Sequence, residues 1–474
     1  MHKFIVLLTA LAWLSGCAVG PDYQPVEPDA PERFLEAPQA SAGSADEQRF
    51  WAGFDDPMLA GLIHQTLDAN RDLRAALARY QRAEALLRGS RAEQLPNVGV
   101  SASAAEQHLA DVERTPPGAG DDRVELYQAA AGLSWELDLF GRLRRASEAQ
   151  RAELGAAGAD LAALQVALVG QLATSYFELR GLQQQLLVAR SNVDNQRQSL
   201  EIVRSRVGAG RGTAFDEVRA ISQLEATRAV IPDLQAAVRA RMFRIAVLTG
   251  QNPGALVDEL APPAPLPESL PVIPVGSPGE VLRRRPDIRA AERRLAAASA
   301  RIGVATADLF PSFSLDALIG SVASDSGDLF SAGAESRRVA LGVDWTFLDF
   351  GRVRSRIDAA DADSQAALAN YEQTVLLALE ETETQLVRYA RSRERSERLG
   401  AATDAAGEAA ELARTRYRQG FIGFFEVLAA EQELIDTRDA LIESRTAETL
   451  AMVNIYRALA GAPGDAEPIA SAND

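Results

Sequence analysis

The sequence contains little cysteine and little histidine, and its charge is mostly of one sign. A single cysteine among 474 residues cannot form an internal disulfide or a thiolate metal site. The three histidines include His64 and His108, which lie far apart and are expected to be polar surface or equatorial residues, so a histidine-rich metal site is disfavoured. Acidic residues outnumber basic ones by 66 to 49, for a net charge of −17, which argues against binding to nucleic acid.

Long apolar runs and catalytic motifs are also scarce. Beyond the N-terminus no uninterrupted run of 18 apolar residues occurs, so we expect no transmembrane helix in the mature chain. Membrane-spanning strands leave a much weaker trace and are not excluded. The sequence has no phosphate-binding loop, nucleophile elbow or cofactor motif. We therefore expect neither enzyme activity nor a bound cofactor.

The N-terminus has the order of a bacterial lipoprotein signal. Lys3 precedes an apolar run of about ten residues, which Leu14-Ser15-Gly16-Cys17 follows. This order predicts a signal peptide over residues 1–16, whose removal makes Cys17 the acylated, palmitate-bearing first residue. Ala18 instead of aspartate follows it, which favours export to the outer membrane. The alternative, an ordinary signal peptide with a chance cysteine, is disfavoured because the chain has no other cysteine.

The chain contains two divergent copies of one unit. Motifs repeat at an offset of 215 residues as far as Pro96 and at 210 from Trp135 onward, so the offset changes between these two residues. One five-residue insertion or deletion therefore separates two copies that a tandem duplication explains. The matched segments are Asp72 with Asp287, Leu95-Pro96 with Phe310-Pro311, Trp135–Arg142 with Trp345–Arg352, and Arg204–Gly210 with Arg414–Gly420.

Composition divides the chain into six segments. Eight prolines between Pro253 and Pro278 exclude helix interiors and indicate an extended connector between the copies. The expected order is a signal peptide at 1–16, a proline-rich extended segment at 17–57, a first repeat at 58–252, the connector at 253–279, a second repeat at 280–461 and a polar tail at 462–474.

Each copy contains two stretches that alternate apolar and polar residues. Strands of roughly ten residues fit this alternation and are long enough to cross a bilayer when tilted. A soluble antiparallel sheet with one wet face gives the same pattern, so periodicity alone leaves both open. The apolar positions are Leu133, Trp135 and Leu137 in the first copy and Val339, Leu341, Val343, Trp345 and Phe347 in the second, with shorter runs starting at Val98 and Phe313.

Two proline-free stretches, 142–207 and 352–418, predict helices of about 100 Å each if continuous. A seven-residue apolar repeat keeps one stripe facing a partner when helices supercoil left-handedly. A dimeric cytosolic coiled coil would show the same repeat, but the lipoprotein signal and the strand pairs argue against it. The stripe of the first stretch is Leu172, Leu179, Leu186, Val193, Leu200 and Val207.

Glycine-rich turns follow both stretches and predict a helical hairpin in each copy. After Gly208 and Gly210, Thr213 is placed to cap a helix whose first turn contains Asp216. Gly420 precedes the matching turn of the second copy. We expect each hairpin tip to lie far from the strands.

An ordered set of short motifs covers nearly all of the mature chain. These motifs resemble the outer membrane efflux lipoproteins of the TolC-like family. The resemblance implies a mainly helical chain with transmembrane strands, three copies of which form a 12-stranded β-barrel (four strands per chain) continued by a long periplasmic α-helical barrel. It makes Trp135 and Trp345 barrel-wall or interface residues and places the connector in an equatorial region. The motifs are Cys17–Tyr23, Leu139–Arg142, Leu282–Leu295, Ile302–Ala305, Phe310-Pro311, Asp349–Arg352 and Arg416-Tyr417 with Gly420.

Physical chemistry agrees with a trimer. Four strands form an open sheet, and lipid offers no partners for its edge backbone groups. Two copies would give eight strands, enough only for a side-chain-filled barrel, whereas three give twelve and room for a lumen.

The resemblance implies a passive outer-membrane channel that exports drugs or other toxic small molecules and so contributes to multidrug resistance. Its expected partners are two further copies, a periplasmic adaptor (membrane fusion protein), an inner-membrane resistance–nodulation–division pump that supplies energy from the proton gradient, and outer-membrane lipid, with no nucleic acid. One alternative is the outer-membrane duct of a type I protein secretion system. A periplasmic adaptor is less favoured, since it would usually contain a single hairpin.

The second hairpin tip departs from the pattern of the family. Members often place a tyrosine, an arginine and two acidic residues there, where they hold neighbouring helices together. Tyr417 and Glu426 match the tyrosine and the first acidic residue, but Ile422 and Ala429 replace the arginine and the second acidic residue.

Aromatic residues crowd the same tip and suggest another kind of gate. Phe421, Phe424 and Phe425 predict an apolar closure or an adaptor-docking surface; the alternative is that these rings pack only within the hairpin. Glu426 and its repeat counterpart Asp216 are expected to make the entrance acidic and to favour cations.

Overall fold

The computed structural model describes residues 18–35, 47–114, 116, 122–271 and 275–459. Two compact units divide these residues. The sheet unit comprises residues 18–27, Arg79–Gly158 and Ala290–Glu372, and the helical unit comprises the rest. Cys17, the predicted lipidation site, lies outside the described residues.

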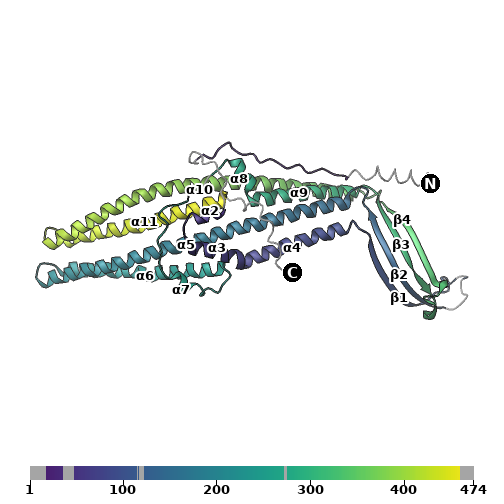
Figure 1. The fold of residues 1–474 in the computed structure, drawn as a ribbon, viewed down its shortest axis with the longest axis horizontal. Coiled ribbons are helices and arrows are strands. Elements are labelled where there is room, and N and C mark those ends of the chain that lie inside the picture. The colour runs from purple at the N-terminus through teal and green to yellow at the C-terminus, as the bar shows by residue number, and fades with distance from the viewer. Residues whose placement is uncertain (1–17, 36–46, 115, 117–121, 272–274, 460–474) are drawn as a thin grey trace. The chain divides into compact units, whose positions relative to one another are not determined.

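Four antiparallel strands form one sheet in the order β1-β2-β3-β4 (Figure 1). This confirms two strands per copy, because β1 and β2 come from the first repeat and β3 and β4 from the second. Within the described residues β1 and β4 are the outer strands of the sheet. The strands are β1 Asn97–His108, β2 Arg123–Leu137, β3 Ser312–Ala323 and β4 Glu335–Asp344.

The fourth strand is shorter in the structure than its alternating sequence pattern predicts. Trp345 and Phe347 continue the alternation but lie outside β4, which ends at Asp344. The last pair of this ladder joins Asp344 to Ser312, and the residue before Ser312 is Pro311, which has no backbone N–H to donate. The prediction that the strand extends through these two aromatics is therefore wrong for the single chain.

Both proline-free stretches form long continuous helices, as predicted. The helix α5 covers Arg142–Gly208 and α10 covers Arg352–Gln419. Each is followed by a shorter helix that runs back along it, α6 Ala214–Leu248 and α11 Phe424–Leu459, so that each copy contains a helical hairpin (Figure 1).

One of these helices passes a length and composition test for a membrane span. The helix α5 contains such an 18-residue window, of which 33% is buried inside the protein. The expectation that the mature chain has no transmembrane helix used a different test, the absence of an uninterrupted run of 18 apolar residues. Core helices of soluble proteins have the same composition, so the finding is weak evidence for a membrane helix.

The seven-residue stripe of α5 faces the interior of the helical unit. Leu172 and Leu179 are fully buried, and Val193 and Leu200 nearly so. Each fully buried leucine contributes about 1.5–3 kcal/mol relative to an exposed one. Burial of this stripe, more than intrinsic helix propensity, stabilises so long a helix.

Shorter helices complete the two repeats. The helix α4 precedes β1 and α9 precedes β3 at the equivalent point of each copy. The segment expected to be extended at 17–57 contains one helical turn, α2, within its described part. The bounds are α2 Glu47–Ala52, α3 Pro57–Ala69, α4 Arg71–Ala92, α7 Val257–Leu260, α8 Pro278–Arg284 and α9 Pro286–Ala307, with 3-10 turns at Ser326–Asp328 and Ala332–Ala334.

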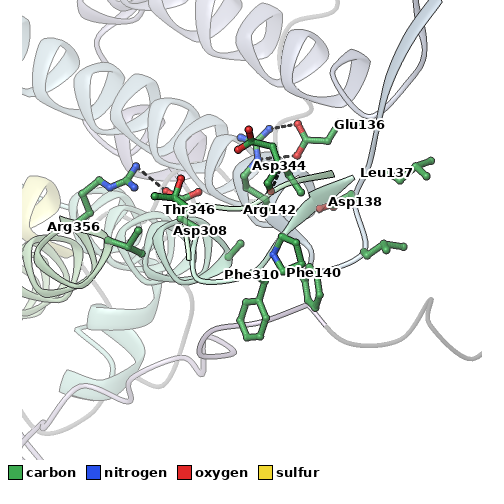
Figure 2. Close-up of a pocket in the computed structure, with 15 residues that line it drawn as sticks. Glu136, Leu137, Asp138, Phe140, Arg142, Asp308, Phe310, Asp344, Thr346 and Arg356 are labelled. Carbon is green, nitrogen blue, oxygen red and sulfur yellow. Dashed lines mark hydrogen bonds and ion pairs between the residues drawn. The ribbon is translucent and has the colours of Figure 1, made fainter. Parts of the chain in front are cut away.

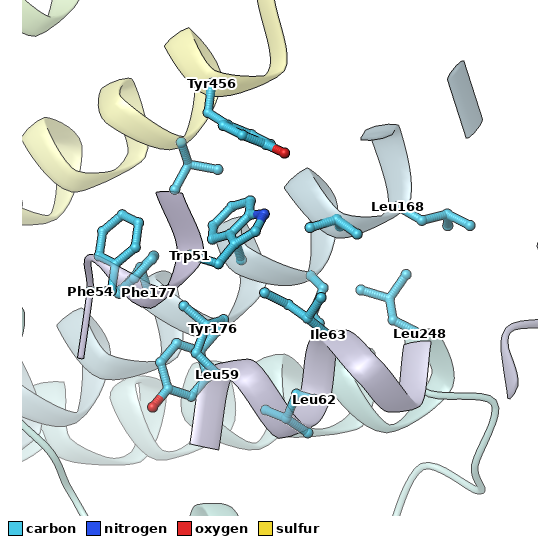
Figure 3. Close-up of a cluster of buried hydrophobic side chains, with 14 of the residues drawn as sticks. Trp51, Phe54, Leu59, Leu62, Ile63, Leu168, Tyr176, Phe177, Leu248 and Tyr456 are labelled. Atoms are coloured by element: carbon cyan, nitrogen blue, oxygen red, sulfur yellow. The ribbon is translucent and has the colours of Figure 1, made fainter. Parts of the chain in front are cut away.

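Aromatic residues from distant parts of the sequence form the core of the helical unit (Figure 3). The ring of Phe50 stacks on Tyr456 of α11 at 4.3 Å, and Trp51 meets the same ring edge-on at 4.9 Å. Tyr176 of α5 donates to the Asp56 carboxylate at 2.5 Å. Burial, reinforced by this hydrogen bond, raises the pKa of Tyr176. These contacts join the N-terminal helices to both hairpins.

Candidate functional site

Both hairpin tips begin with the same backbone turn. Gly210 and Gly420 have φ of +73° and +85°, in the left-handed region that glycine adopts without strain. At each turn the next amide bonds back to a helix carbonyl, from Arg211 to Arg206 at 2.8 Å and from Phe421 to Arg416 at 3.0 Å. The repeated motif Arg-x-Arg-x-x-x-Gly therefore produces the same helix ending twice.

The first tip is held by its own residues. Thr213 caps α6, as predicted: its side-chain oxygen accepts from the amide of Asp216, whose carboxylate accepts from the Thr213 backbone in return. This reciprocal arrangement is a capping box. The Asp216 carboxylate, one of our candidate gate residues, thus has a structural partner within its own helix turn.

At the second tip, two of the four candidate aromatic residues are buried. The Tyr417 and Phe424 rings lie 5.6 Å apart. They pack in a cluster with residues of the first hairpin, among them Leu200 and Val203 of α5. These two rings therefore stabilise the packing of one hairpin against the other.

The other two rings are exposed, and that of Phe425 lies beside an arginine of the first hairpin. Phe421 is 77% exposed and Phe425 is 60% exposed. Phe215, the repeat counterpart of Phe425, is 67% exposed. The Arg219 guanidinium carbon lies 5.5 Å from the Phe215 ring centroid and 5.0 Å from that of Phe425, within cation–π range. We call Phe215, Arg219, Phe421 and Phe425 the tip patch.

The three phenylalanines of the second tip, predicted together from the sequence, have different surroundings in the structure. Phe424 packs inward, whereas Phe421 and Phe425 face outward. Phe215 and Arg219 are not among the residues predicted from the sequence, and the structure adds them to this surface. The repeat offset of 210 residues, which relates Phe215 to Phe425, was the signal that could have found the first of them.

An arginine at this tip comes from the other hairpin. Arg206 of α5 places its guanidinium carbon 4.4 Å from the Tyr417 ring centroid and donates through Nη1 to the Tyr417 carbonyl. Burial raises the pKa of the Tyr417 hydroxyl, against the opposing effect of the Arg206 charge. Arg206 therefore supplies a cation beside Tyr417, although Ile422 occupies the position expected for the arginine.

A buried carboxylate makes a second link between the hairpins. Glu431 of α11 is only 4% exposed. It accepts from Ser199 of α5 at 2.9 Å and from Arg414 of α10 at 2.8 Å. Gln223 of α6 also donates to Gln432 of α11 at 2.6 Å. We call the contacts centred on Arg206 and Glu431 the inter-hairpin contacts.

Glu426 differs from its repeat counterpart in its surroundings. It lies exposed in the first turn of α11, where the positive end of the helix dipole stabilises a carboxylate. Asp216, by contrast, is half-buried in its capping box. Of the two acidic candidates, Glu426 has the carboxylate that is exposed to solvent.

The duplicated tryptophans make the same hydrogen bond at the end of the sheet. The indole N–H of Trp135 donates to the Gln94 carbonyl at 3.0 Å, and that of Trp345 to the Leu309 carbonyl at 3.1 Å. Gln94 and Leu309 are themselves related by the 215-residue offset. The repeat is therefore preserved at the level of single hydrogen bonds.

A pocket of about 240 Å³ lies where β2 and α5 meet α9 and β3 (Figure 2). Arg142 makes a two-point ion pair with Glu136, with N···O distances of 2.9 and 2.6 Å. Phe140 stacks on Phe310 at 4.6 Å. Arg356 likewise pairs with Asp308 at 2.8 Å, and within the described part of the chain no group of three or more His, Cys, Asp or Glu side chains could hold a metal ion. The pocket is a structural junction of the two repeats.

The N-terminal segment binds beside this junction. The Val19 amide donates to the Phe140 carbonyl at 3.0 Å. Arg145 of α5 donates to the Val19 carbonyl at 3.1 Å and pairs with Asp22 at 2.6 Å. Ala18, which follows Cys17 directly, fits against Gly141, where a Cβ would lie 2.5 Å from the alanine Cβ. The neighbour of the predicted lipidation site is thus held at the strand–helix junction.

The two histidines of the mature chain, His64 and His108, lie on the surface. The side chains of His64 and His108 are 81% and 70% exposed, and each lies near one aspartate. Neither belongs to the tips or to the junction pocket.

Comparison with known proteins identifies the family. The model of the family described as outer membrane efflux protein matches residues 62–251 and 277–461, one match for each repeat. Nodulation protein T of Rhizobium leguminosarum bv. trifolii is 32% identical over 459 residues, covering 93% of this chain and 94% of its own. The solvent efflux pump outer membrane protein SrpC of Pseudomonas putida is 31% identical over 470 residues, covering 95% and 97%.

A solved structure agrees with this assignment. The outer-membrane channel OprN superposes with a TM-score of 0.87 at 40% sequence identity, covering 94% of this chain and 99% of its own. Long helices, four antiparallel strands and two sequence repeats are the TolC-like fold of trimeric outer-membrane channels. The chain therefore belongs to the outer membrane efflux protein family and is a non-enzymatic efflux channel of the outer membrane with a periplasmic extension.

Proposed function

We propose that three copies of this chain form a closed channel through which small apolar toxic molecules leave the cell. The observation that carries the proposal is the four-stranded sheet, whose outer strands β1 and β4 have exposed apolar residues such as Val100 and Leu341. In lipid, unpaired edge backbone groups cost several kcal/mol each, so the edges need partner strands. Three copies supply twelve strands and space for a lumen.

The cargo is inferred from named relatives and from chemistry. Relatives at 31% identity are named for the efflux of solvent, toluene and antibiotics. Apolar solvents and hydrophobic antibiotics are therefore the cargo we propose. A passive channel needs no binding site for its cargo, which is compatible with a junction pocket where Arg142 pairs with Glu136 and Arg356 with Asp308.

The proposed partners are a periplasmic adaptor and a proton-driven inner-membrane pump of the resistance–nodulation–division class. The exposed tip patch supports a contact with the adaptor, because its exposed aromatic rings, two of them beside one arginine, resemble the aromatic and arginine content of protein interfaces. The energy for transport would come from the pump.

The gate is proposed to lie at the hairpin tips. In this arrangement the inter-hairpin contacts of Arg206 and Glu431 hold the two hairpins of one chain together, and Glu426 contributes negative charge to the entrance. Opening would require the hairpins to separate, which breaks the contact of Arg206 with Tyr417 and the hydrogen bond from Ser199 to Glu431.

We also propose a lipid on Cys17. The support comes from sequence, in the tetrapeptide that ends at Cys17, and from the contacts of Val19 and Arg145, which fix the following residues at the end of the sheet. Radiolabelled palmitate should be incorporated into the parent chain and not into Cys17→Ala. We expect that variant still to assemble, because the strands themselves hold the channel in the membrane.

The test of the proposed function is complementation. The chain would be expressed with a periplasmic adaptor and a proton-driven pump of the resistance–nodulation–division class in a host without its own efflux channel, and tolerance of toluene and efflux of a hydrophobic dye would be measured. We expect both to rise only when all three proteins are present. Unchanged tolerance and dye efflux, with the chain present in the outer membrane, would contradict the proposed cargo.

A further inference from the structure

The sheet preserves the internal repeat residue by residue. Val98 of β1 lies opposite Leu133 of β2. Adding 215 to the first number and 210 to the second gives Phe313 and Val343, which lie opposite each other in β3 and β4. The sequence offsets therefore convert the register of the first hairpin into that of the second without a shift.

The pairing of β2 with β3 is different, because it joins the end of one repeat to the start of the next. Here Leu133 lies opposite Ala317 and Trp135 opposite Leu315. No second copy of this pairing exists within the described chain, because β4 and β1 are at opposite edges of the sheet (Figure 1). In a ring of identical chains, β4 of one protomer and β1 of the next stand in the same relation.

We propose that this β4–β1 contact between protomers has the register of the β2–β3 contact, moved by the two repeat offsets. It rests on the trimer proposed above and specifies which residues meet. For the pair Leu133 and Ala317, adding 210 to the β2 residue gives Val343, and subtracting 215 from the β3 residue gives Ala102. The proposal therefore places Val343 opposite Ala102 of the neighbouring copy. The pair Trp135 and Leu315 in the same way places Trp345 opposite Val100 of the neighbouring copy. Because β4 ends at Asp344 in the single chain, this pairing would lengthen the strand.

The distribution of apolar residues independently supports the facing of side chains in this register. Apart from Ala105, the valines and alanines of β1 have even numbers, whereas the apolar residues of β4 and its extension have odd numbers apart from Ala340. The even-numbered set is Val98, Val100, Ala102 and Ala104, and the odd-numbered set is Val339, Leu341, Val343, Trp345 and Phe347. Directly opposed residues point to the same side of a sheet, and a slip of one residue would turn every side chain of one strand to the other side. The proposed register keeps both apolar sets on one side.

Polar residues on the other side of the sheet match as well. Within the chain, Ser134 of β2 lies opposite Asp316 of β3. The same offsets convert this pair into Asp344 opposite Ser101 of the neighbouring copy. In the second pair the aspartate stands where the first pair has the serine, and the serine where the first has the aspartate. Both pairs therefore join one serine to one aspartate.

The proposal also accounts for the exposed aromatic residues that follow β4. Phe140 stacks on Phe310 at the junction of the repeats. Their counterparts are Phe350 and Leu95, which in the single chain are 90% and 65% exposed. Phe350 also has φ of +53°, a conformation that a bulky residue adopts at a cost in energy. Packing of Phe350 on Leu95 of the next protomer would bury both side chains.

Disulfide cross-linking tests the register directly. The chain would carry Val343→Cys with Ala102→Cys, and, as a second pair on the other side of the sheet, Asp344→Cys with Ser101→Cys. Opposed residues of antiparallel strands have Cα atoms about 4.5–5.5 Å apart, within the range for a disulfide. The two cysteines of a pair stand on opposite edges of one sheet, so a bond between them must join two chains. The control is Val343→Cys with Ala104→Cys, displaced by two residues on the same side.

We expect oxidised outer membranes to give covalent dimers and trimers with both matched pairs, about tenfold more than with the displaced pair, and none with single variants or the parent chain. Equal or better cross-linking of the displaced pair would overturn the register. So would failure of both matched pairs in a variant shown to be trimeric by native mass spectrometry, while the proposed function would stand. A parent chain that is monomeric in that measurement would overturn the proposed function as well.

Discussion

The two repeats have the same elements but differ in what they contact within one chain. At the end of β2, Phe140 stacks on Phe310 and Arg142 pairs with Glu136. At the equivalent end of β4, Phe350 is 90% exposed and Thr346 replaces the glutamate. The first junction is complete inside the chain and the second is not. A duplicated unit whose two halves are unequally buried therefore indicates where a further copy binds.

The hairpin tips also differ between the two copies. The first tip is held by its own capping box, whereas the second depends on Arg206 and Ser199 of the first hairpin. The predictions below test these two differences, from the largest expected effect to the smallest.

Removal of the buried carboxylate should have the largest effect. Glu431→Ala leaves Arg414 and Ser199 without their shared acceptor, and loss of one partner of a buried pair costs about 3 kcal/mol, at the low end of the usual range because Arg414 is partly exposed. Thermal unfolding followed by circular dichroism in detergent should show a lower midpoint. The matched control is Glu433→Ala, at an exposed position of the same helix, which should change the free energy of unfolding by less than about 0.5 kcal/mol. Equal midpoints for the two variants would contradict a structural role of Glu431.

Substitution of the two phenylalanines that follow β2 and β4 should affect different properties, the stability of the protomer for Phe140 and the stability of the trimer for Phe350. Phe140→Ala removes a half-buried stacked ring and should destabilise the protomer by about 2 kcal/mol, less than for a fully buried ring. Phe350→Ala should leave the unfolding of the dissociated chain nearly unchanged but lower the temperature at which trimers dissociate in dodecyl sulfate. If Phe350→Ala destabilised the isolated chain as much as Phe140→Ala, the comparison between the junctions would fail.

Loss of the first cap should have a moderate, local effect. Thr213→Ala removes the oxygen that accepts from the Asp216 amide, at a cost of about 1 kcal/mol. Hydrogen exchange should become faster in the first turn of α6 and stay the same in the first turn of α11. The control Thr213→Ser keeps the acceptor and should exchange like the parent chain; equal acceleration at both tips would show that the first tip is not held locally.

The smallest effect concerns selectivity. Three exposed Glu426 side chains at the entrance should favour cations through ordinary Coulomb attraction, which salt weakens. Single-channel recordings of Glu426→Gln should show a lower cation-to-anion permeability ratio at low salt, with Asp216→Asn, already bonded in its capping box, changing it less. An unchanged ratio for Glu426→Gln would reject the acidic entrance.

Much of this fold follows from local patterns in the sequence. The long helices could be predicted because proline is absent from them and the apolar stripe of α5 recurs every seven residues, and the tips because glycine and Thr213 end and begin helices in a known way. The true end of β4 could not be predicted, since alternation continues through Trp345 but the ladder requires a partner, and Pro311 interrupts it. Strand length depends on the neighbouring strand as well as on the strand itself.

The candidate site could be predicted only in part, because its contacts are long-range. Tyr417 and the phenylalanines were visible in the sequence, but nothing local indicated that Phe424 packs inward while Phe425 faces outward. Arg206 lies more than two hundred residues before Tyr417, so its place above that ring depends on how the two hairpins pack. Glu431 escaped notice for the same reason, as acidic residues on long helices are usually solvated.

The central claim is that identical chains close the open sheet, and counting the chains tests it most directly. Native mass spectrometry of the protein, extracted from outer membranes in mild detergent, should give one species of three chains. A stable single chain that retains its β-signal by circular dichroism would contradict the account, because the edges of β1 and β4 would then need no partner.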